Sequence, residues 1–290
     1  MAVIRKSVLD KFRRCKRWIG RLINYQYSIT RDDYQLSIPV IYDFGRAHLD
    51  VHECHITAIF EKLQKIGALN LLVDIGANIG QTFVKHTLLT RGEALYIGFE
   101  PNPSASFYLQ EIININNVKR AIVIPVALAS DSGIKKIFLG QSNRPDPGGS
   151  INEAIRDQTY YSAHGYVSVL SGDRILEDLA LDERNFTIKI DTEGSELEVL
   201  NGIHEILRSK RPFVIVEILA PCPDFSESVN NYRLKRREDI FQLMHQLNYQ
   251  VYAISEDGRL LKMGSSRPYL KKYSNDYLMV PKEQIDRLNP

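Results

Sequence analysis

Two acidic residues and the glycine loop between them are the part of this chain whose residue types and spacing most clearly predict chemistry. Asp74 ends an apolar run, Gly76 and Gly80 stand in the loop that follows, and Glu100 ends the next apolar run. Glycine lets a ligand approach the backbone closely, and a helix that starts after such a loop points N–H groups at the ligand. A carboxylate like Glu100 can accept both hydroxyls of a ribose. The unit therefore predicts a nucleotide-type site.

The middle of the loop separates two classes of cofactor. The loop reads D-x-G-x-N-x-G, so Asn78 stands where a dinucleotide site needs glycine to pass a pyrophosphate. The leading acid, Asp74, is poorly suited to a pyrophosphate and well suited to an ammonium group. We therefore expect S-adenosylmethionine, which has an amino acid end, a ribose and no phosphate. NAD is the alternative cofactor. The loop could also bind no ligand, in which case its glycines would only tighten a strand-to-helix turn.

A second group of acids follows two later apolar runs. Asp191 and Glu193 come directly after one run, and Glu217 ends the next. Because ligands of a doubly wound sheet bind outside the carboxyl ends of its strands, these acids should face the same crevice as the first two. They are candidate bases. His164, in a polar insert, is a further candidate because histidine titrates near neutral pH.

Alternating strands and helices must position these residues. The pattern predicts an α/β fold with a doubly wound, mostly parallel, seven-stranded sheet that has helices on both faces and a final antiparallel hairpin. Such an ending favours a class I methyltransferase, with its Rossmann-like fold, over a dehydrogenase. The predicted core strands are 71–74, 94–99, 120–128, 186–191, 213–218, 249–254 and 277–280. Ser195 and Glu198 have the spacing of a capping box, so we expect Glu198 to fix a helix start.

The chain divides into an extension and one large domain. Residues 1–24 carry eight basic residues and one acid, with apolar residues at helical spacing. Such a helix can lie on an anionic membrane, or it can dock on protein. We predict that residues 1–50 form this basic amphipathic helix and a connector with a short strand or two, and that residues 51–290 form the methyltransferase domain. The polar insert 141–166 is interpreted as a substrate loop or lid, with a mobile surface loop as the alternative.

Composition excludes several classes of protein. A net charge of +2 gives no case for nucleic acid binding. Three scattered cysteines show neither a disulfide framework nor metal-ligand spacing, which favours a reducing, cytoplasmic location. No apolar stretch is long enough to span a bilayer, and no signal peptide is evident.

Four motifs together carry a family resemblance. DIGANIG, FEPNP, IKIDTEGSELEVLNG and PFVIVEI, in this order and spacing, resemble the FkbM family of S-adenosylmethionine-dependent methyltransferases over about residues 70–220. The resemblance implies a class I methyltransferase fold, and it marks Asp191, Glu193 and Gly194 as forming the site. The predicted cofactor-binding residues are Asp74, Gly76, Ala77, Asn78, Gly80, Glu100, Pro101 and Asn102.

The family implies methyl transfer from S-adenosylmethionine to a hydroxyl of a sugar, a glycan or a similar natural product. The predicted catalytic residues are Asp191, Glu193, His164 and Glu217. We predict no metal, although paired acids could hold a divalent ion that orients two sugar hydroxyls. The alternatives are an NAD-dependent oxidoreductase and a non-catalytic, Rossmann-like binding or scaffold protein.

Overall fold

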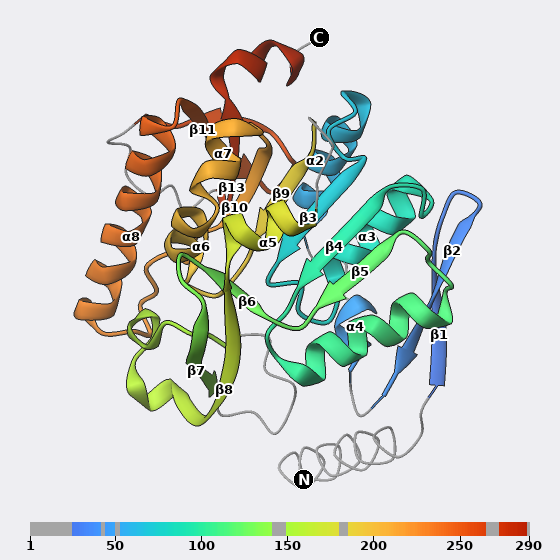
Figure 1. The fold of residues 1–290 in the computed structure, drawn as a ribbon, viewed down its shortest axis with the longest axis horizontal. Coiled ribbons are helices and arrows are strands. Elements are labelled where there is room, and N and C mark those ends of the chain that lie inside the picture. The colour runs from blue at the N-terminus through green and yellow to red at the C-terminus, as the bar shows by residue number, and fades with distance from the viewer. Residues whose placement is uncertain are drawn as a thin grey trace, which may run out of the picture.

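The computed structural model describes residues 25–41, 44–49, 53–140, 149–179, 185–264 and 273–288. An eight-stranded sheet with helices on both faces forms its centre, and a three-stranded sheet lies beside it (Figure 1). The predicted α/β, doubly wound, Rossmann-like class is confirmed. The predicted N-terminal helix lies outside the described residues.

Parallel strands form the middle of the large sheet, and antiparallel strands close it on one side. In space the strands run β12-β11-β13-β10-β9-β3-β4-β5. Strands β10, β9, β3, β4 and β5 are parallel, whereas β13, β11 and β12 pair antiparallel. The bounds are β3 Leu71–Ile75, β4 Leu95–Phe99, β5 Ala121–Ile124, β9 Thr187–Ile190, β10 Phe213–Glu217, β11 Tyr249–Ser255, β12 Leu260–Lys262 and β13 Tyr273–Pro281. The carboxyl ends of the parallel strands therefore share one edge.

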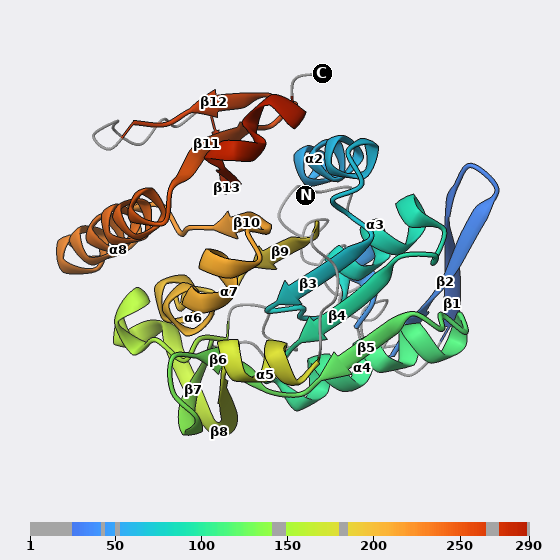
Figure 2. The same ribbon diagram turned by 45° about the horizontal axis from the view of Figure 1, so that its top comes forward.

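Two clusters of buried apolar side chains fill the two faces of this sheet. Alternate strand residues point to opposite faces, so Val73 packs with helices α5 to α8 and Leu72 with α2 to α4. Figure 2 shows α6 and α7 on one side of the sheet and α2 and α3 on the other. The helices are α2 Cys54–Lys65, α3 Gln81–Thr90, α4 Pro103–Ile115, α5 Gly172–Asp178, α6 Glu196–Gly202, α7 His204–Ser209 and α8 Glu227–Gln246, with 3-10 turns at Arg46–Leu49 and Lys282–Leu288.

The sheet differs from the prediction in two places. It has eight strands rather than seven, because β12 adds an edge strand to β11. The strand predicted over residues 120–128 is two strands, since Pro125 has no N–H to continue the ladder. The second of them, β6 (Ala127–Ala129), leaves the large sheet and pairs with β8 (Tyr161–Ser171), which also pairs with β7 (Gly133–Gly140).

The predicted connector contains a hairpin that packs on the main domain. Strands β1 (Tyr25–Arg31) and β2 (Tyr34–Val40) pair antiparallel, which confirms the expected short strands. The Tyr108 hydroxyl of α4 donates to the Pro39 carbonyl oxygen at 2.5 Å. Leu36 and Ile38 belong to the same buried cluster as α2, α3 and α4. The hairpin therefore shares the core of the large domain.

The insert predicted as irregular is partly regular. Residues 141–148 lie outside the described residues. Residues 149–160 contain two short 3-10 turns, Glu153–Ile155 and Gln158–Tyr160. The insert ends within strand β8, which begins at Tyr161. Figure 1 shows β7 and β8 projecting beyond the large sheet on the side of α6.

Candidate functional site

A cavity of about 290 Å³ lies at the carboxyl edge of the parallel strands. Loops after β3, β4, β9 and β10 contribute to its wall, together with β6, β7 and the start of the insert. The lining residues are Glu53, Ile75, Gly76, Asn78, Gln81, Phe99, Glu100, Pro101, Asn102, Val126, Ala127, Leu128, Ile137, Gly149, Ile151, Asp191, Thr192, Glu193, Ser195 and Glu217. The structure thus brings most of the predicted cofactor-binding and catalytic residues together.

Gly76 is required where two loops meet. Its φ is +89°, and a Cβ there would overlap the carbonyl oxygen of Asp191. The N–H groups of Gly76 and Ala77 donate to the Phe99 carbonyl oxygen at 2.9 and 3.0 Å. Asn78 also has a left-handed φ of 48°, which asparagine tolerates better than most residues. The backbone of the glycine loop is therefore fixed against the strands on both sides.

Glu100 is held by the backbone of two neighbouring loops. Its carboxylate accepts the N–H of Asn78 at 2.8 Å and the N–H of Asn102 at 2.7 Å. Burial raises the pKa of Glu100 to about 7, while the two backbone donors act in the opposite direction. Each carboxylate oxygen has a second lone pair. Glu100 can therefore accept two hydroxyl groups from a ligand, as ribose recognition requires.

Asp74 lies near the end of β3, and its side chain is fully buried. The Tyr96 hydroxyl donates to Asp74 Oδ2 at 2.6 Å, and Oδ1 has no partner among the described residues. Burial raises the pKa of Asp74 to about 6, and the charge of Lys189 opposes this. Asp74, Ala77 and Gly80 are buried and are not among the residues that line the cavity, so their predicted contacts with the cofactor stay predictions.

Lys189 is a buried cation beside the predicted catalytic acids. Its ammonium donates to Asp191 Oδ2 at 2.8 Å, and its side chain is 3% exposed. Burial opposes its charge, but the carboxylates around it, Asp191 first, outweigh burial and raise its pKa. In the sheet Lys189 stands opposite Asp74. The lysine therefore neutralises acids that would otherwise be buried alone.

Glu217 completes a cluster of carboxyl groups. The charge of Asp191, burial and the charge of Asp276 together raise its pKa to about 10. Asp276 is opposite Glu217 in the β10–β13 register, and its Oδ2 accepts a hydrogen bond from His55 Nε2 at 2.7 Å. Glu217 therefore keeps its proton at neutral pH, because a further charge next to Asp191 is unfavourable.

Glu193 faces the cavity from a left-handed backbone position, with a φ of 54°. Its carboxylate pairs with the guanidinium of Arg156, which also lies over the Tyr160 ring at 4.8 Å. Burial, followed by the charge of Asp191, raises the pKa of Glu193 to about 7. Arg156 belongs to the insert. The sequence did not predict it as a site residue, because nothing in the local pattern links it to Glu193.

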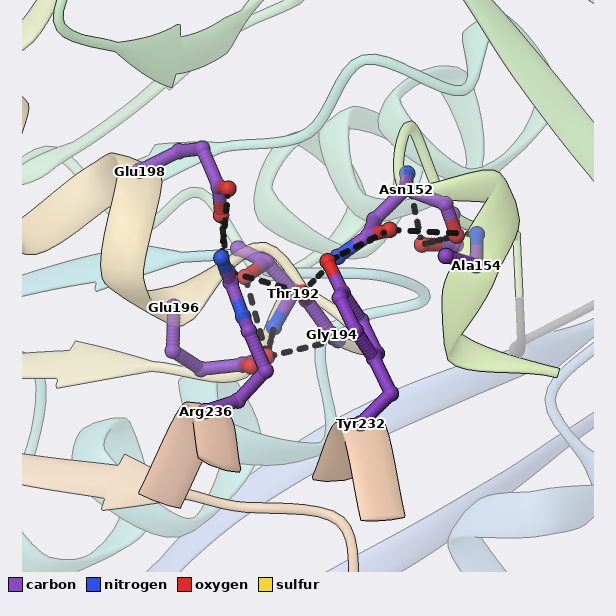
Figure 3. Close-up of polar contacts among 9 residues, drawn as sticks. Asn152, Ala154, Thr192, Gly194, Glu196, Glu198, Tyr232 and Arg236 are labelled. Atoms are coloured by element: carbon purple, nitrogen blue, oxygen red, sulfur yellow. Dashed lines mark hydrogen bonds and ion pairs between the residues drawn. The ribbon is translucent and has the colours of Figure 1, made fainter. Parts of the chain in front are cut away.

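The capping prediction at the next helix is wrong. Ser195 makes no capping hydrogen bond. Glu196 instead ties the preceding loop to the start of the helix, since its Oε1 accepts from the N–H of Thr192 at 3.2 Å and of Gly194 at 2.8 Å. Glu198 points away and pairs with Arg236 of α8 (Figure 3). The hydroxyl of Ser195 is buried at the cavity wall without a partner among the described residues.

Residues of the insert and of helix α8 make hydrogen bonds to the loop between β9 and α6. Asn152 Nδ2 donates to the Gly194 carbonyl oxygen at 2.7 Å and lies 3.1 Å from the Tyr232 hydroxyl. Arg236 Nη2 donates to the same carbonyl oxygen at 3.2 Å. In Figure 3 Tyr232 and Arg236 both rise from α8 toward the loop. Arg233 of α8 donates to the Ile155 carbonyl oxygen at 3.0 Å. Two elements that are distant in sequence thus fix the position of Glu193.

His164 lies elsewhere. It is on β8, exposed, and opposite Phe138 in the β7–β8 register. It is not among the residues that line the cavity. It contributes instead to a separate shallow groove with Lys136, Phe138 and Tyr161. The structure therefore does not bring His164 to the three clustered acids.

The described residues contain neither a candidate metal site nor a membrane-spanning helix. No group of three or more His, Cys, Asp or Glu residues among them is arranged to hold a metal ion. No helix within the described ranges is both long and apolar enough to cross a bilayer.

Comparisons with known proteins place this site in a family. The hexuronic acid methyltransferase AglP of Haloferax volcanii is 35% identical over 157 residues, which are 52% of this chain and 56% of AglP. The chain thus spans about half the length of that relative. The FkbM methyltransferase of Methylobacillus flagellatus superposes with a TM-score of 0.42 at 17% identity, over 72% of this chain and 43% of that one. An O-methyltransferase of Bacillus cereus superposes with a TM-score of 0.44 at 14% identity, over 81% of this chain and 86% of that one. The Methyltransferase FkbM domain matches residues 74–251, so the chain belongs to the FkbM methyltransferase family.

Proposed function

We propose that this protein uses S-adenosylmethionine to methylate a hydroxyl group of a sugar or glycan. One observation carries the proposal: the ribose-type acid Glu100 and the clustered carboxyls of Asp191 and Glu193 line the same cavity. Family membership supports methyl transfer. The name of the relative AglP, a hexuronic acid methyltransferase, supports a sugar-type acceptor.

The residues at the cavity suit this cofactor. Glu100 offers lone pairs to two ribose hydroxyls, and Asn102 and Asn78 fix its carboxylate from both sides. The unpartnered hydroxyl of Ser195 is available to a polar group of the ligand. Several carboxyls at the wall suit a cationic molecule. When bound, S-adenosylmethionine supplies a methyl group that is already activated on a sulfonium.

The protein's own contribution to the reaction is to hold the acceptor and take up its proton. Asp191, fixed by Lys189 at 2.8 Å, accepts a hydrogen bond from an acceptor hydroxyl and orients it. Glu193, fixed by Arg156, would accept the proton of the reacting hydroxyl on its carboxylate as the O–CH3 bond forms, while the sulfonium would lose its methyl group and leave as a neutral thioether. A pKa of about 7 suits this role, because a general base works best near the operating pH. Positioning of this kind contributes roughly 7–11 kcal/mol.

The proposal is tested by methyl transfer from labelled S-adenosylmethionine to a panel of glycosides, with the wild-type protein and with Asp191→Asn. We expect label on a sugar oxygen with the wild type, a loss of about 100-fold with Asp191→Asn, and equal cofactor binding by calorimetry. Wild-type turnover in the variant would remove Asp191 from the mechanism. Cofactor binding without transfer to any hydroxyl would favour a binding or scaffold protein, and binding of NAD instead would favour the oxidoreductase.

A further inference from the structure

We propose that Glu217 keeps its proton during the reaction and donates a hydrogen bond to an oxygen of the sugar acceptor, so that it binds the acceptor and is not a base. This inference rests on the proposed function and gives a binding role to a residue that the sequence marked only as a candidate base. Three carboxyl groups lie in a row across the sheet, and Glu217 is the middle one.

The sheet places Glu217 between two other acids. In the β10–β9 register Val216 pairs with Ile190, so Glu217 and Asp191 follow as the next residue of each segment. On its other side Glu217 is directly opposite Asp276 of β13. Neighbouring strands lie only about 4.8 Å apart, and like charges in opposite positions are unfavourable. Ionising all three carboxyls would therefore be costly.

Both neighbours of Glu217 have a partner that can carry positive charge. Lys189 Nζ donates to Asp191 Oδ2 at 2.8 Å, and His55 Nε2 of α2 donates to Asp276 Oδ2 at 2.7 Å. Within the described ranges, no hydrogen bond or ion pair joins the Glu217 carboxyl to a Lys, Arg or His side chain. The middle acid is therefore the one that keeps a proton.

The charges around Glu217 act mainly in one direction. The charge of Asp191, burial and the charge of Asp276, with a smaller contribution from Glu193, raise the pKa of Glu217 to about 10, while Lys189 opposes them. A carboxyl with such a pKa is protonated at neutral pH. This agrees with the position of Glu217 in the row, and it makes Glu217 unsuited to accept a proton from a hydroxyl.

The carboxyl of Glu217 is at the cavity wall, where a ligand can reach it. Glu217 and Asp191 both line the cavity. A protonated carboxyl has one O–H donor, whereas an ionised one only accepts. Asp191 can therefore accept from one sugar hydroxyl while Glu217 donates to a neighbouring oxygen of the same ring. Ser195 at the same wall has a buried hydroxyl without a partner among the described residues, which is a second polar group open to a ligand.

Two neutral substitutions distinguish a hydrogen-bond donor from a base. Glu217→Gln keeps the shape of the side chain and an N–H donor, and Glu217→Met keeps its length without a donor. Glu256→Gln, at an exposed position, is the control. Calorimetry measures the affinity of each glycoside of the panel for protein saturated with S-adenosylhomocysteine, and KM and kcat are measured with S-adenosylmethionine. Thermal unfolding and cofactor binding show whether each variant folds.

We expect Glu217→Gln to bind the glycoside within about threefold of wild type, and Glu217→Met to bind it at least about tenfold more weakly, as for one lost hydrogen bond. The loss should appear in KM rather than in kcat. An equal loss in both variants would overturn the proposal in favour of a base, and wild-type affinity in Glu217→Met would overturn it as well. Binding of no glycoside by the wild type would also count against it. Glycosides that bind but receive no methyl group would contradict only the proposed function.

A pH series gives a second test, which does not require Glu217→Met to fold. The wild type should lose affinity for the glycoside relative to Glu217→Gln as pH rises from 8 to 10.5, because the O–H donor disappears when Glu217 ionises near pH 10. The ratio of the two affinities should change by about fourfold at pH 10.5. A ratio that stays constant over this range would overturn the proposal.

Discussion

At the scale of single residues, carboxyl groups with raised pKa values set the chemistry of the site. Glu193 has a pKa of about 7 and must be ionised to accept a proton. We therefore predict that the rate of methyl transfer rises with pH below about 7 and levels off above it. In Glu193→Gln the rate should fall about 100-fold and this ionisation should vanish from the pH profile. Steady-state kinetics from pH 5.5 to 9 would measure both effects, and a variant that keeps the wild-type profile would exclude Glu193 as the base.

The raised pKa of Glu217 leads to a prediction about how the stability of the fold depends on pH. Its folded pKa of about 10 lies above the ordinary value, so the folded protein keeps a proton that the unfolded chain releases above about pH 4.5. This contribution to stability is therefore complete at acidic pH and declines as pH rises toward 10. Relative to wild type, Glu217→Gln should gain unfolding free energy on the order of 1 kcal/mol per pH unit between pH 5.5 and 8.

Thermal unfolding of wild type and Glu217→Gln at several pH values would measure this gain. Glu256→Gln, a change at an exposed position, is the control and should show the wild-type pH trend. A constant difference between Glu217→Gln and wild type across the pH range would contradict the assignment of a protonated Glu217.

At the scale of elements, the contact between the β3 and β9 loops forms the site. Gly76→Ala would drive a Cβ into the carbonyl oxygen of Asp191 and strain a backbone with a φ of +89°. We predict a loss of more than about 2 kcal/mol of unfolding free energy and of cofactor binding. Gly264→Ala is the matched control, since its Cβ would meet no described atom within 4 Å. Denaturant unfolding of both variants tests this, and equal stabilities would show that the loops do not need to touch.

Sequence patterns predicted which strands end in acids, because every parallel strand of a doubly wound sheet delivers its last residue to the same edge. Asp191, Glu193 and Glu217 meet there as predicted. The sequence did not predict that the Asp74 side chain is fully buried, because its burial depends on Tyr96 and Lys189 from neighbouring strands.

The sequence also missed how the insert contributes to the site. Arg156 reaches Glu193 only because the 3-10 turns of the insert dock on the β9 loop and on α8. The wrong capping assignment at Ser195 has a similar origin. Glu198 is attracted to Arg236, a residue of α8 that is distant in sequence. Local spacing contains no information about such partners.

At the scale of the whole molecule, residues 1–24 have a net charge of +7, whereas the rest of the chain has a net charge of −5. Their eight basic residues and helical apolar spacing motivate a proposal of peripheral membrane contact. We predict that the full chain sediments with vesicles containing phosphatidylserine at low salt, that it does so less at 0.5 M salt, and that a chain lacking residues 1–24 does not. Equal sedimentation of both chains would contradict membrane contact, and a change only in oligomeric state would favour docking on protein.

The central claim is that one cavity holds S-adenosylmethionine through Glu100 and places an acceptor beside Asp191 and Glu193. Calorimetric titration of S-adenosylmethionine into wild type, Glu100→Gln and the exposed control Glu256→Gln tests it most directly. The account predicts binding by wild type and the control, and a loss of about 10- to 100-fold in Glu100→Gln, as expected when charge-assisted hydrogen bonds are weakened. Absence of binding by the wild type, or equal affinity in Glu100→Gln, would contradict the account.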